Sequence, residues 1–334
     1  MTGKIRAAIT GTGMYVPDNV VTNKDLEKFM DTSDEWIRQR SGIEERRWVE
    51  AGVAPSDLGL IASQRALDAA GLKATDIDMI VVASLSPGYY FPGVSAFIQT
   101  KLGLETTPAF DIRAQCTGFI FALDTARCFI ESGNYKKILV VGAEVHSSAL
   151  DISTRGRDIA VLFGDGAGAV IMEATDEPER GIISCHLHTQ GSMADKLCVK
   201  FPGTIQKPYI THEDLESGIC YPRMEGKHVF KSASTRMPEV VREALAFNNL
   251  TVEDVDWFLF HQANLRINEM VLKQLGAPAE KTYNNIMRYG NCSAASTPMV
   301  LDELVRGGKI KKGDLICMSG FGAGYTWGSA VMRW

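Results

Sequence analysis

The segment LDAAGLKATDIDMIVVAS at residues 67–84 recurs in altered form as LAFNNLTVEDVDWFLFHQ at residues 245–262. Both copies join the end of a helical pattern to an apolar run through a turn that contains two aspartates. Two further blocks recur in the same order at similar spacing, so we predict an internal duplication. These blocks are KKILVVGAE (136–144) with KKGDLICMSG (311–320), and FGDGAGAVIM (163–172) with GFGAGYTWGSAVM (320–332).

The alternation of apolar runs and helical patterns predicts the α/β class. Strand-like runs such as KILVVGAE (137–144) are separated by helical patterns such as LGLIASQRALDAAG (58–71). Together with the repeat, this predicts two similar α/β halves, residues 1–175 and 176–334. Near the junction, residues 191–230 follow neither period, and we expect an insertion over a functional site.

Composition excludes several classes of protein. The 334 residues are 45% hydrophobic and 22% charged with a formal net charge of −5, and no block of five like charges occurs, which disfavours nucleic-acid and membrane-surface partners. No apolar run reaches the roughly 18 residues of a membrane-spanning helix, and the first residues lack a signal-peptide pattern, so we expect a cytoplasmic protein. The seven cysteines form no CxxC pair, which argues against a disulfide framework or a zinc cluster.

One cysteine lies at a position suited to chemistry. The stretch AFDIRAQCTGFIFALDTARCFIESGNY (109–135) predicts a strand end, a turn and an amphipathic helix that begins near Cys116. Unpaired N–H groups and the positive end of the helix dipole favour a thiolate, so we expect a lowered pKa and a nucleophile. The alternative is a small buried apolar residue.

The duplicated half supplies two possible partners for this cysteine. The segment GNCSAASTPMVLDELV (290–305) is the copy of the Cys116 segment, which places Asn291 at the mouth of the equivalent helix. His261 follows the strand-like run FLF, at the end where open α/β sheets present ligand-binding groups. A cysteine, a histidine and an asparagine at element termini are therefore predicted to meet in one site.

Two glycine-rich loops need a separate explanation. FGDGAG (163–168) and GFGAG (320–324) lack the GK[ST] of a phosphate-binding loop, and GTG (11–13) does not complete a dinucleotide-binding motif. They fit tight turns at strand ends, and they fit equally well a close backbone approach to a site with N–H groups free to bind an oxyanion.

Six motifs in order carry a resemblance to a known family over essentially the whole chain. They are DTSDEWIRQRSGIEERR, the Cys116 segment, FGDGAGA, HQANLRI, GNCSAAS and GFGAGYTWGSA. With these motifs the chain resembles beta-ketoacyl-acyl carrier protein synthase III, a thiolase-fold condensing enzyme. The resemblance implies a five-layered α-β-α-β-α architecture of two duplicated halves and a catalytic triad of Cys116, His261 and Asn291.

The same resemblance implies a reaction in two half-reactions. Cys116 takes an acyl group from acyl-CoA, and the backbone N–H groups of Cys116 and Ala323 hold the oxyanion. Malonyl-acyl carrier protein then condenses with the acyl group by a decarboxylative Claisen reaction that initiates fatty acid biosynthesis, and His261 and Asn291 stabilise the enolate. No cofactor and no metal are implied, and a homodimer is expected.

Binding residues also follow from the resemblance. Trp36 and Arg40 in DEWIRQR would stack on the CoA adenine with Arg157 nearby, although a core tryptophan and a surface ion pair are the alternatives. Phe91 would end the acyl pocket across the dimer interface, unless it is a core residue. Arg266 would dock the carrier protein. Lysines that would add charge there, or would be ordinary surface cations, are Lys227, Lys231 and Lys273.

Several alternatives stay open or are disfavoured. The segment SPGYYFPG (86–93) departs from the pattern common in acetyl-specific members, so the starter group is open, and a specialised-metabolism relative with another starter or acceptor is the second candidate. A papain-like thiol hydrolase has the same Cys, His, Asn order, but its CGSCW-type signature and its fold do not fit. A non-catalytic acyl-CoA-binding protein would not need the triad. His186 and His188 lack a fourth metal ligand beside Cys185, and Cys292 is assigned to packing.

Overall fold

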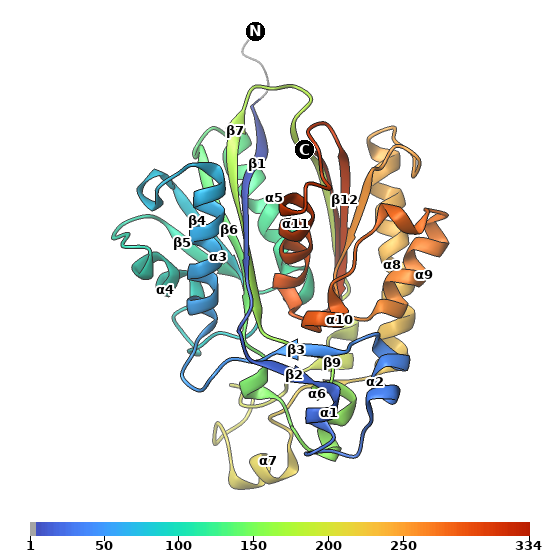
Figure 1. Ribbon diagram of the computed structural model, residues 1–334. Coiled ribbons are helices and arrows are strands. Elements are labelled where there is room, and N and C mark those ends of the chain that lie inside the picture. The colour runs from blue at the N-terminus through green and yellow to red at the C-terminus, as the bar shows by residue number, and fades with distance from the viewer. Residues whose placement is uncertain (1–4) are drawn as a thin grey trace.

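The computed structural model describes residues 5–334, which form five layers of alternating helices and sheets (Figure 1). Two helices cover the outer face of the first sheet, two lie between the sheets, and two cover the outer face of the second sheet. These pairs are, in that order, α3 (Pro55–Ala70) and α4 (Val94–Lys101), α5 (Gly118–Glu131) and α11 (Ser296–Arg306), and α8 (Gly226–Phe247) and α9 (Leu265–Leu275). The predicted α-β-α-β-α architecture is confirmed.

The first sheet has five strands in the order β1-β7-β6-β4-β5. The central strand β6 pairs in parallel with β4 and antiparallel with β7, and β7 pairs antiparallel with β1. All eight residues of β6 except the first are buried, as expected for a strand covered on both faces. Its strands are β1 (Arg6–Tyr15), β4 (Met79–Ala83), β5 (Ala109–Ile112), β6 (Lys137–Glu144) and β7 (Gly166–Thr175).

The second sheet has four strands in the order β11-β12-β13-β8 and repeats this topology. Here β12 is parallel to β11 and antiparallel to β13, which pairs with β8. The three recurring blocks of sequence coincide with the strand pairs β4 and β11, β6 and β12, and β7 and β13, so the internal duplication is confirmed in the fold. The strands are β8 (Gly181–Thr189), β11 (Trp257–Phe260), β12 (Leu315–Gly322) and β13 (Thr326–Arg333).

The central helical layer joins the two sheets through one apolar core. The inner faces of both sheets and the buried faces of α5 and α11 form this core, which includes Phe119, Ile120 and Leu123 from α5. Each such side chain contributes about 1.5–3 kcal/mol on burial. A close approach is also required at Gly142 in β6, because a Cβ there would lie 2.6 Å from the backbone oxygen of Ala294. Glycine at this position therefore lets the turn that precedes α11 reach the first sheet.

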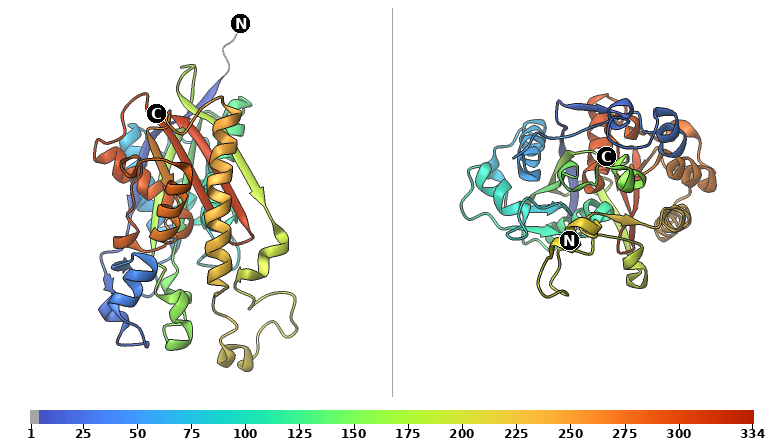
Figure 2. Two further views of the ribbon diagram at one scale, coloured as in Figure 1. Left: turned by 90° about the vertical axis from the view of Figure 1, so that its right-hand side faces the viewer. Right: turned by 90° about the horizontal axis from the view of Figure 1, so that it is seen from below.

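The remaining elements gather at one end of the layers and cover the starts of the two central helices (Figures 1 and 2). They come from four parts of the chain, including the region 191–230 that was expected to be an insertion. That region contains short elements, and its last residues, 226–230, already belong to α8. The elements are β2 (Val20–Thr22), α1 (Asn23–Leu26), α2 (Asp34–Ser41), β3 (Glu45–Arg47), α6 (Arg157–Ala160), β9 (Leu197–Cys198), α7 (His212–Ser217), β10 (Arg223–Met224) and α10 (Ile286–Tyr289).

Two general properties bear on the function. Among residues 5–334, no helix has both the length and the apolar character needed to cross a membrane. The described part of the chain also contains no group of three or more His, Cys, Asp or Glu side chains arranged to hold a metal ion. His186 and His188 lie on the same face of β8, as the alternation predicts, and both contact Glu243, at 3.2 Å from His186 Nδ1 and 2.7 Å from His188 Nε2.

Candidate active site

Cys116 is held in a tight turn at the start of α5. It lies in the 3₁₀ turn Gln115–Thr117, and its side chain is buried. Gln115 has a φ of +47°, which few residues other than glycine adopt, and such backbone strain is concentrated at functional sites. Gly322 lies directly against the nucleophile, since a Cβ at Gly322 would be 2.9 Å from Cys116 Cβ. The glycine-rich loop 320–324 therefore makes the close approach that was one of its two interpretations.

His261 lies immediately after β11 with its imidazole fully enclosed. Its backbone N–H donates to Ser319 O at 2.9 Å, and the residue is 2% exposed. Neither ring nitrogen has a hydrogen-bond partner among residues 5–334. Burial lowers the pKa of His261 to about 3, with a smaller contribution from nearby His146. The side chain is therefore a neutral imidazole whose donor is free for a substrate atom.

Asn291 also lies at this site. It precedes the 3₁₀ turn Ser293–Ala295, which is the counterpart in the second half of the turn Gln115–Thr117. Ser293 begins this turn with the same φ of +47° as Gln115, so the residue equivalent to Cys116 is Ala294, and Asn291 lies earlier than the sequence comparison placed it. Its Oδ1 accepts the Ser293 N–H at 2.8 Å, which fixes the amide and leaves the NH₂ group as the free donor. The FGDGAG loop holds the Asn291 backbone, through Gly164 N–H to Asn291 O at 3.2 Å.

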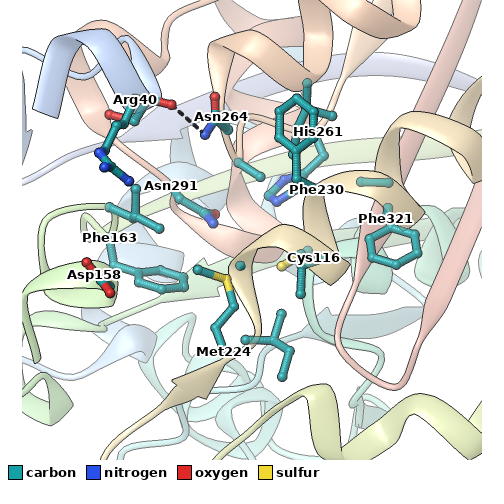
Figure 3. Close-up of a pocket in the computed structure, with 18 of the residues that line it drawn as sticks. Arg40, Cys116, Asp158, Phe163, Met224, Phe230, His261, Asn264, Asn291 and Phe321 are labelled. Atoms are coloured by element: carbon teal, nitrogen blue, oxygen red, sulfur yellow. Dashed lines mark hydrogen bonds between the residues drawn. The ribbon is translucent and has the colours of Figure 1, made fainter.

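The three predicted triad residues line one cavity of about 570 Å³ (Figure 3). Cys116 also lines a second cavity of about 1090 Å³, so this residue lies between the two. The first cavity extends toward Trp36 and Arg40, and the second extends toward Tyr89 and Tyr90. This arrangement gives one nucleophile access to two separate binding volumes.

The expected low pKa of Cys116 is wrong for this structure. Burial raises the pKa of the thiol to about 11, and the nearby Glu144 carboxylate acts in the same direction. The Ser293 hydroxyl, 3.4 Å from the sulfur, and the backbone N–H groups of Cys116 and Ala323 oppose this effect but do not overcome it. The helix start does supply hydrogen-bond donors that lower the pKa of Cys116. Burial away from water raises this pKa by more, because it destabilises the charged thiolate. Cys116 is a thiol at neutral pH.

The residues predicted to bind CoA are brought together, and two of them, Trp36 and Arg40, line the smaller cavity. The guanidinium groups of Arg40 and Arg157 both lie over the Trp36 ring, at 4.5 and 5.0 Å from its centroid. Ser33 caps α2 by accepting the Trp36 N–H, which orients the helix that carries Trp36 and Arg40. An adenine would have to displace one guanidinium to stack on the indole, because Arg40 covers the ring directly.

Phe91 and Arg266 lie outside the cavities. Phe91 is 79% exposed and continues a surface of aromatic side chains formed with Tyr89 and Tyr90, and only the two tyrosines line the larger cavity. Arg266 begins the exposed side of α9, where it bonds Glu269 at 3.1 Å. Of the lysines considered with it, Lys227 lines the smaller cavity, and Lys231 and Lys273 are exposed.

Two buried residues near Cys116 were missed in the sequence. Glu144, at the end of β6, is fully buried and accepts hydrogen bonds from Ser86 N–H at 3.1 Å and from its hydroxyl at 2.5 Å. His146 lines the larger cavity and has no hydrogen bond to its Nε2. Their position at the end of a strand is the signal that could have revealed them, as it did for His261. Cys292 packs against Ala295 and Met299, in agreement with a packing role.

A cysteine, a neutral histidine and a free amide donor, held at the centre of a duplicated five-layer fold, define a thiolase-fold condensing enzyme. Family models support this class: residues 110–191 match 3-oxoacyl-[acyl-carrier-protein] synthase III, and residues 245–334 match its C-terminal region. The chain therefore has both halves of the family pattern in the expected order.

Individual relatives agree with the family models. Beta-ketoacyl-[acyl-carrier-protein] synthase III of Xanthomonas campestris pv. campestris is 43% identical over the full length of both chains. The crystal structure of 3-oxoacyl-[acyl-carrier-protein] synthase III from Aquifex aeolicus VF5 superimposes with a TM-score of 0.90 at 41% identity, covering 98% of this chain and all of that one. The priming beta-ketosynthase of the R1128 polyketide pathway gives 0.89 at 33% identity, covering 100% and 98%. The chain belongs to the beta-ketoacyl-[acyl-carrier-protein] synthase III family.

Proposed function

We propose that this enzyme transfers an acyl group from acyl-CoA to Cys116 and condenses it with malonyl-acyl carrier protein, the step that initiates fatty acid biosynthesis. The observation that carries the proposal is that two donors lie in the cavity that contains Cys116. They are the His261 imidazole, which has no partner among residues 5–334, and the NH₂ group of Asn291, whose Oδ1 accepts the Ser293 N–H. Neutral donors are suited to a reaction in which loss of carbon dioxide creates the carbanion, because no base is needed to remove a proton from carbon. Condensing enzymes of this family are acyltransferases.

In the first half-reaction, Cys116 sulfur attacks the thioester carbonyl of acyl-CoA. The backbone N–H groups of Cys116 and Ala323, which already face the sulfur, stabilise the tetrahedral oxyanion. The bond to the CoA sulfur then breaks, and the proton lost by the Cys116 thiol leaves with CoA. Because the thiol is neutral at rest, this proton transfer is part of loading.

In the second half-reaction, the malonyl thioester carbonyl accepts hydrogen bonds from His261 and from the Asn291 NH₂ group. Cleavage of the bond to the carboxylate releases carbon dioxide and leaves its electron pair as an enolate held by these two donors. The enolate carbon attacks the acyl carbonyl on Cys116, and collapse of that oxyanion breaks the bond to sulfur. The products are a 3-ketoacyl carrier protein and the Cys116 thiolate, which regains a proton.

The binding roles are proposed from position. We assign CoA to the smaller cavity, with Trp36, Arg40 and Arg157 at its mouth, and the carrier protein to the surface around Arg266. Exposed aromatic side chains at Tyr89, Tyr90 and Phe91 support a homodimer, since a large exposed apolar patch is typical of an interface. Phe91 would then complete the partner's acyl cavity.

Three further assignments complete the proposal. We retain the division into halves 1–175 and 176–334, although the halves pack closely, as the bond of 2.7 Å from Thr12 Oγ1 to Asp302 Oδ1 illustrates. We propose that the enzyme needs no cofactor and that it is located in the cytoplasm.

We assign the larger cavity, of about 1090 Å³, to the acyl group and call it the acyl cavity. Its size supports a second function, a specialised relative that takes a starter group longer than acetyl.

Intact-protein mass spectrometry tests these assignments. Wild type and Cys116→Ser would be incubated with acetyl-, branched and longer acyl-CoA thioesters, and malonyl-acyl carrier protein would then be added. Loading by acetyl-CoA and discharge to a 3-ketoacyl carrier protein support the initiating role. Loading only by longer or branched groups, or no discharge to this acceptor, would favour the specialised function. An absence of any adduct that depends on Cys116 would refute the mechanism.

A further inference from the structure

A second histidine lies in the wall of the larger cavity that Cys116 also lines. His146 follows β6, and its ring packs on Phe163 with the two centroids 4.6 Å apart. The residue is 7% exposed, and its Nε2 is buried without a hydrogen-bond partner among residues 5–334. The reaction described above makes no use of this side chain.

The backbone of His146 is held firmly by one carboxylate. Asp165, a buried residue of the FGDGAG loop, accepts the N–H of His146 at 2.7 Å and the N–H and hydroxyl of Ser147 at 2.9 and 2.5 Å. Three donors from two consecutive residues therefore converge on the same acceptor group. These hydrogen bonds fix the backbone from which the His146 side chain projects, and packing on Phe163 limits the rotation of the imidazole.

An unpaired nitrogen in this position is costly. A buried polar atom without a partner loses its hydrogen bonds to water and gains none in return, and folded proteins leave few of them. His261 has the same feature, and its free nitrogens face the reacting groups. The larger cavity is lined mainly by apolar side chains, including Leu150, Leu197 and Phe201. Polar side chains such as Lys101, Arg113 and Gln115 line other parts of it. A buried polar group without a partner in the wall of such a cavity can select a ligand by one hydrogen bond.

The protonation state of the His146 imidazole limits the kinds of ligand group that it can bind. Burial lowers the pKa of His146 to about 3, so the ring is neutral at physiological pH and offers one donor and one acceptor. It has no charge with which to attract a carboxylate. Phe163, on which the ring packs, also lines the smaller cavity and forms a backbone bridge with Asn291. His146 is therefore close to the reacting end of the acyl cavity.

We propose that His146 is a specificity-determining residue that hydrogen-bonds a hydroxyl or oxo oxygen carried near the thioester end of the acyl group. An unsubstituted chain of the same length would fill the cavity but leave the imidazole unpaired. This inference rests on the proposed function, since it concerns the acyl group that Cys116 receives.

A competition experiment tests the proposal. The full-length enzyme would be offered equal amounts of octanoyl-CoA, 3-hydroxyoctanoyl-CoA and 3-oxooctanoyl-CoA, and the adducts on Cys116 would be counted by intact mass. One added hydrogen bond predicts a preference of about 2- to 12-fold for an oxygenated chain. His146→Leu should bring the ratio close to one by slowing the oxygenated substrates. His146→Gln retains a donor and an acceptor and should keep part of the preference, whereas His212→Leu, a matched change at an exposed histidine, should keep all of it.

The outcomes separate this proposal from the one on which it rests. Equal loading of all three thioesters by the wild type would overturn it, and so would an unchanged ratio in His146→Leu. If no thioester loads, the proposed function itself fails. If His146→Leu does not fold, the wild-type ratio and the His146→Gln variant still decide the matter.

Discussion

Replacing Asn291 with alanine removes one of the two donors assigned to the enolate and leaves the nucleophile in place. The Asn291 amide is oriented because its Oδ1 accepts the Ser293 N–H at 2.8 Å, so its NH₂ group is the part lost to the substrate. Loading uses different donors, the N–H groups of Cys116 and Ala323. We therefore expect Asn291→Ala to slow condensation much more than loading.

The size of the effect follows from the number of donors. Loss of one preorganised donor to an oxyanion costs about 2.7–4 kcal/mol, which corresponds to a 10²- to 10³-fold fall in rate. The same substitution leaves the buried Ser293 N–H without its acceptor, so the free energy of unfolding should also fall by roughly 1–3 kcal/mol. Single-turnover loading and the discharge of acylated enzyme by malonyl-acyl carrier protein would be timed separately, below the temperature at which the variant unfolds.

A matched control is available at Asn248. Its side-chain amide bonds Ser184 Oγ and Ala244 O, each at 2.7 Å, far from either cavity in the fold, so Asn248→Ala should lose stability without a change in either half-reaction. Equal losses in loading and condensation by Asn291→Ala would refute the assigned role. An unchanged condensation rate would show that His261 stabilises the enolate without Asn291.

Three further predictions concern separate parts of the site. Gly322→Ala should slow loading by about 10- to 100-fold in single-turnover assays, because the new Cβ displaces Cys116, and a normal rate would show that the loop yields freely. Burial raises the pKa of Glu144 to about 7, so the folded state holds a proton that the unfolded chain releases near its ordinary value of 4.5. The free energy of unfolding should therefore fall by about 3 kcal/mol as pH rises from 4.5 to 7, and Glu144→Gln should flatten this slope in denaturant titrations; an identical slope in the variant would contradict it. Trp36→Ala should raise KM for acyl-CoA by about 2- to 10-fold and leave an acyl-pantetheine, which lacks the nucleotide, unaffected, while equal effects on both would exclude adenine stacking.

The fold could be predicted because duplication is visible in a single sequence. Strand blocks of similar pattern recur in order, and their apolar runs have the length of buried strands, so local periodicity and repetition were sufficient. The match of Gly142 and Gly320 within the paired blocks has a spatial reason. Gly142 lies against the turn that precedes α11, and Gly320 lies against residues at the start of α5. The repetition predicted two similar α/β halves, whereas the five-layer order was implied by the resemblance to a known family.

The chemistry of the site could be predicted only in part. The repeat placed Cys116 and Asn291 near two helix starts, and the strand end placed His261 beside them. It did not show that Ala294 is the true counterpart of Cys116, because the offset depends on a turn whose first residue has a positive φ in both halves. It also missed His146 and Glu144, which have no motif of their own.

The sequence by itself therefore determined the duplicated α/β architecture and the identity of the three residues proposed for catalysis. Only the tertiary structure decided their protonation states, because the pKa of Cys116, of His261 and of Glu144 depends on how completely distant segments exclude water from each group. The tertiary structure also decided that Cys116 opens to two cavities and that His146 lines one of them. Burial is a sum over contacts between residues far apart in the chain, so no local pattern of amino acids records it.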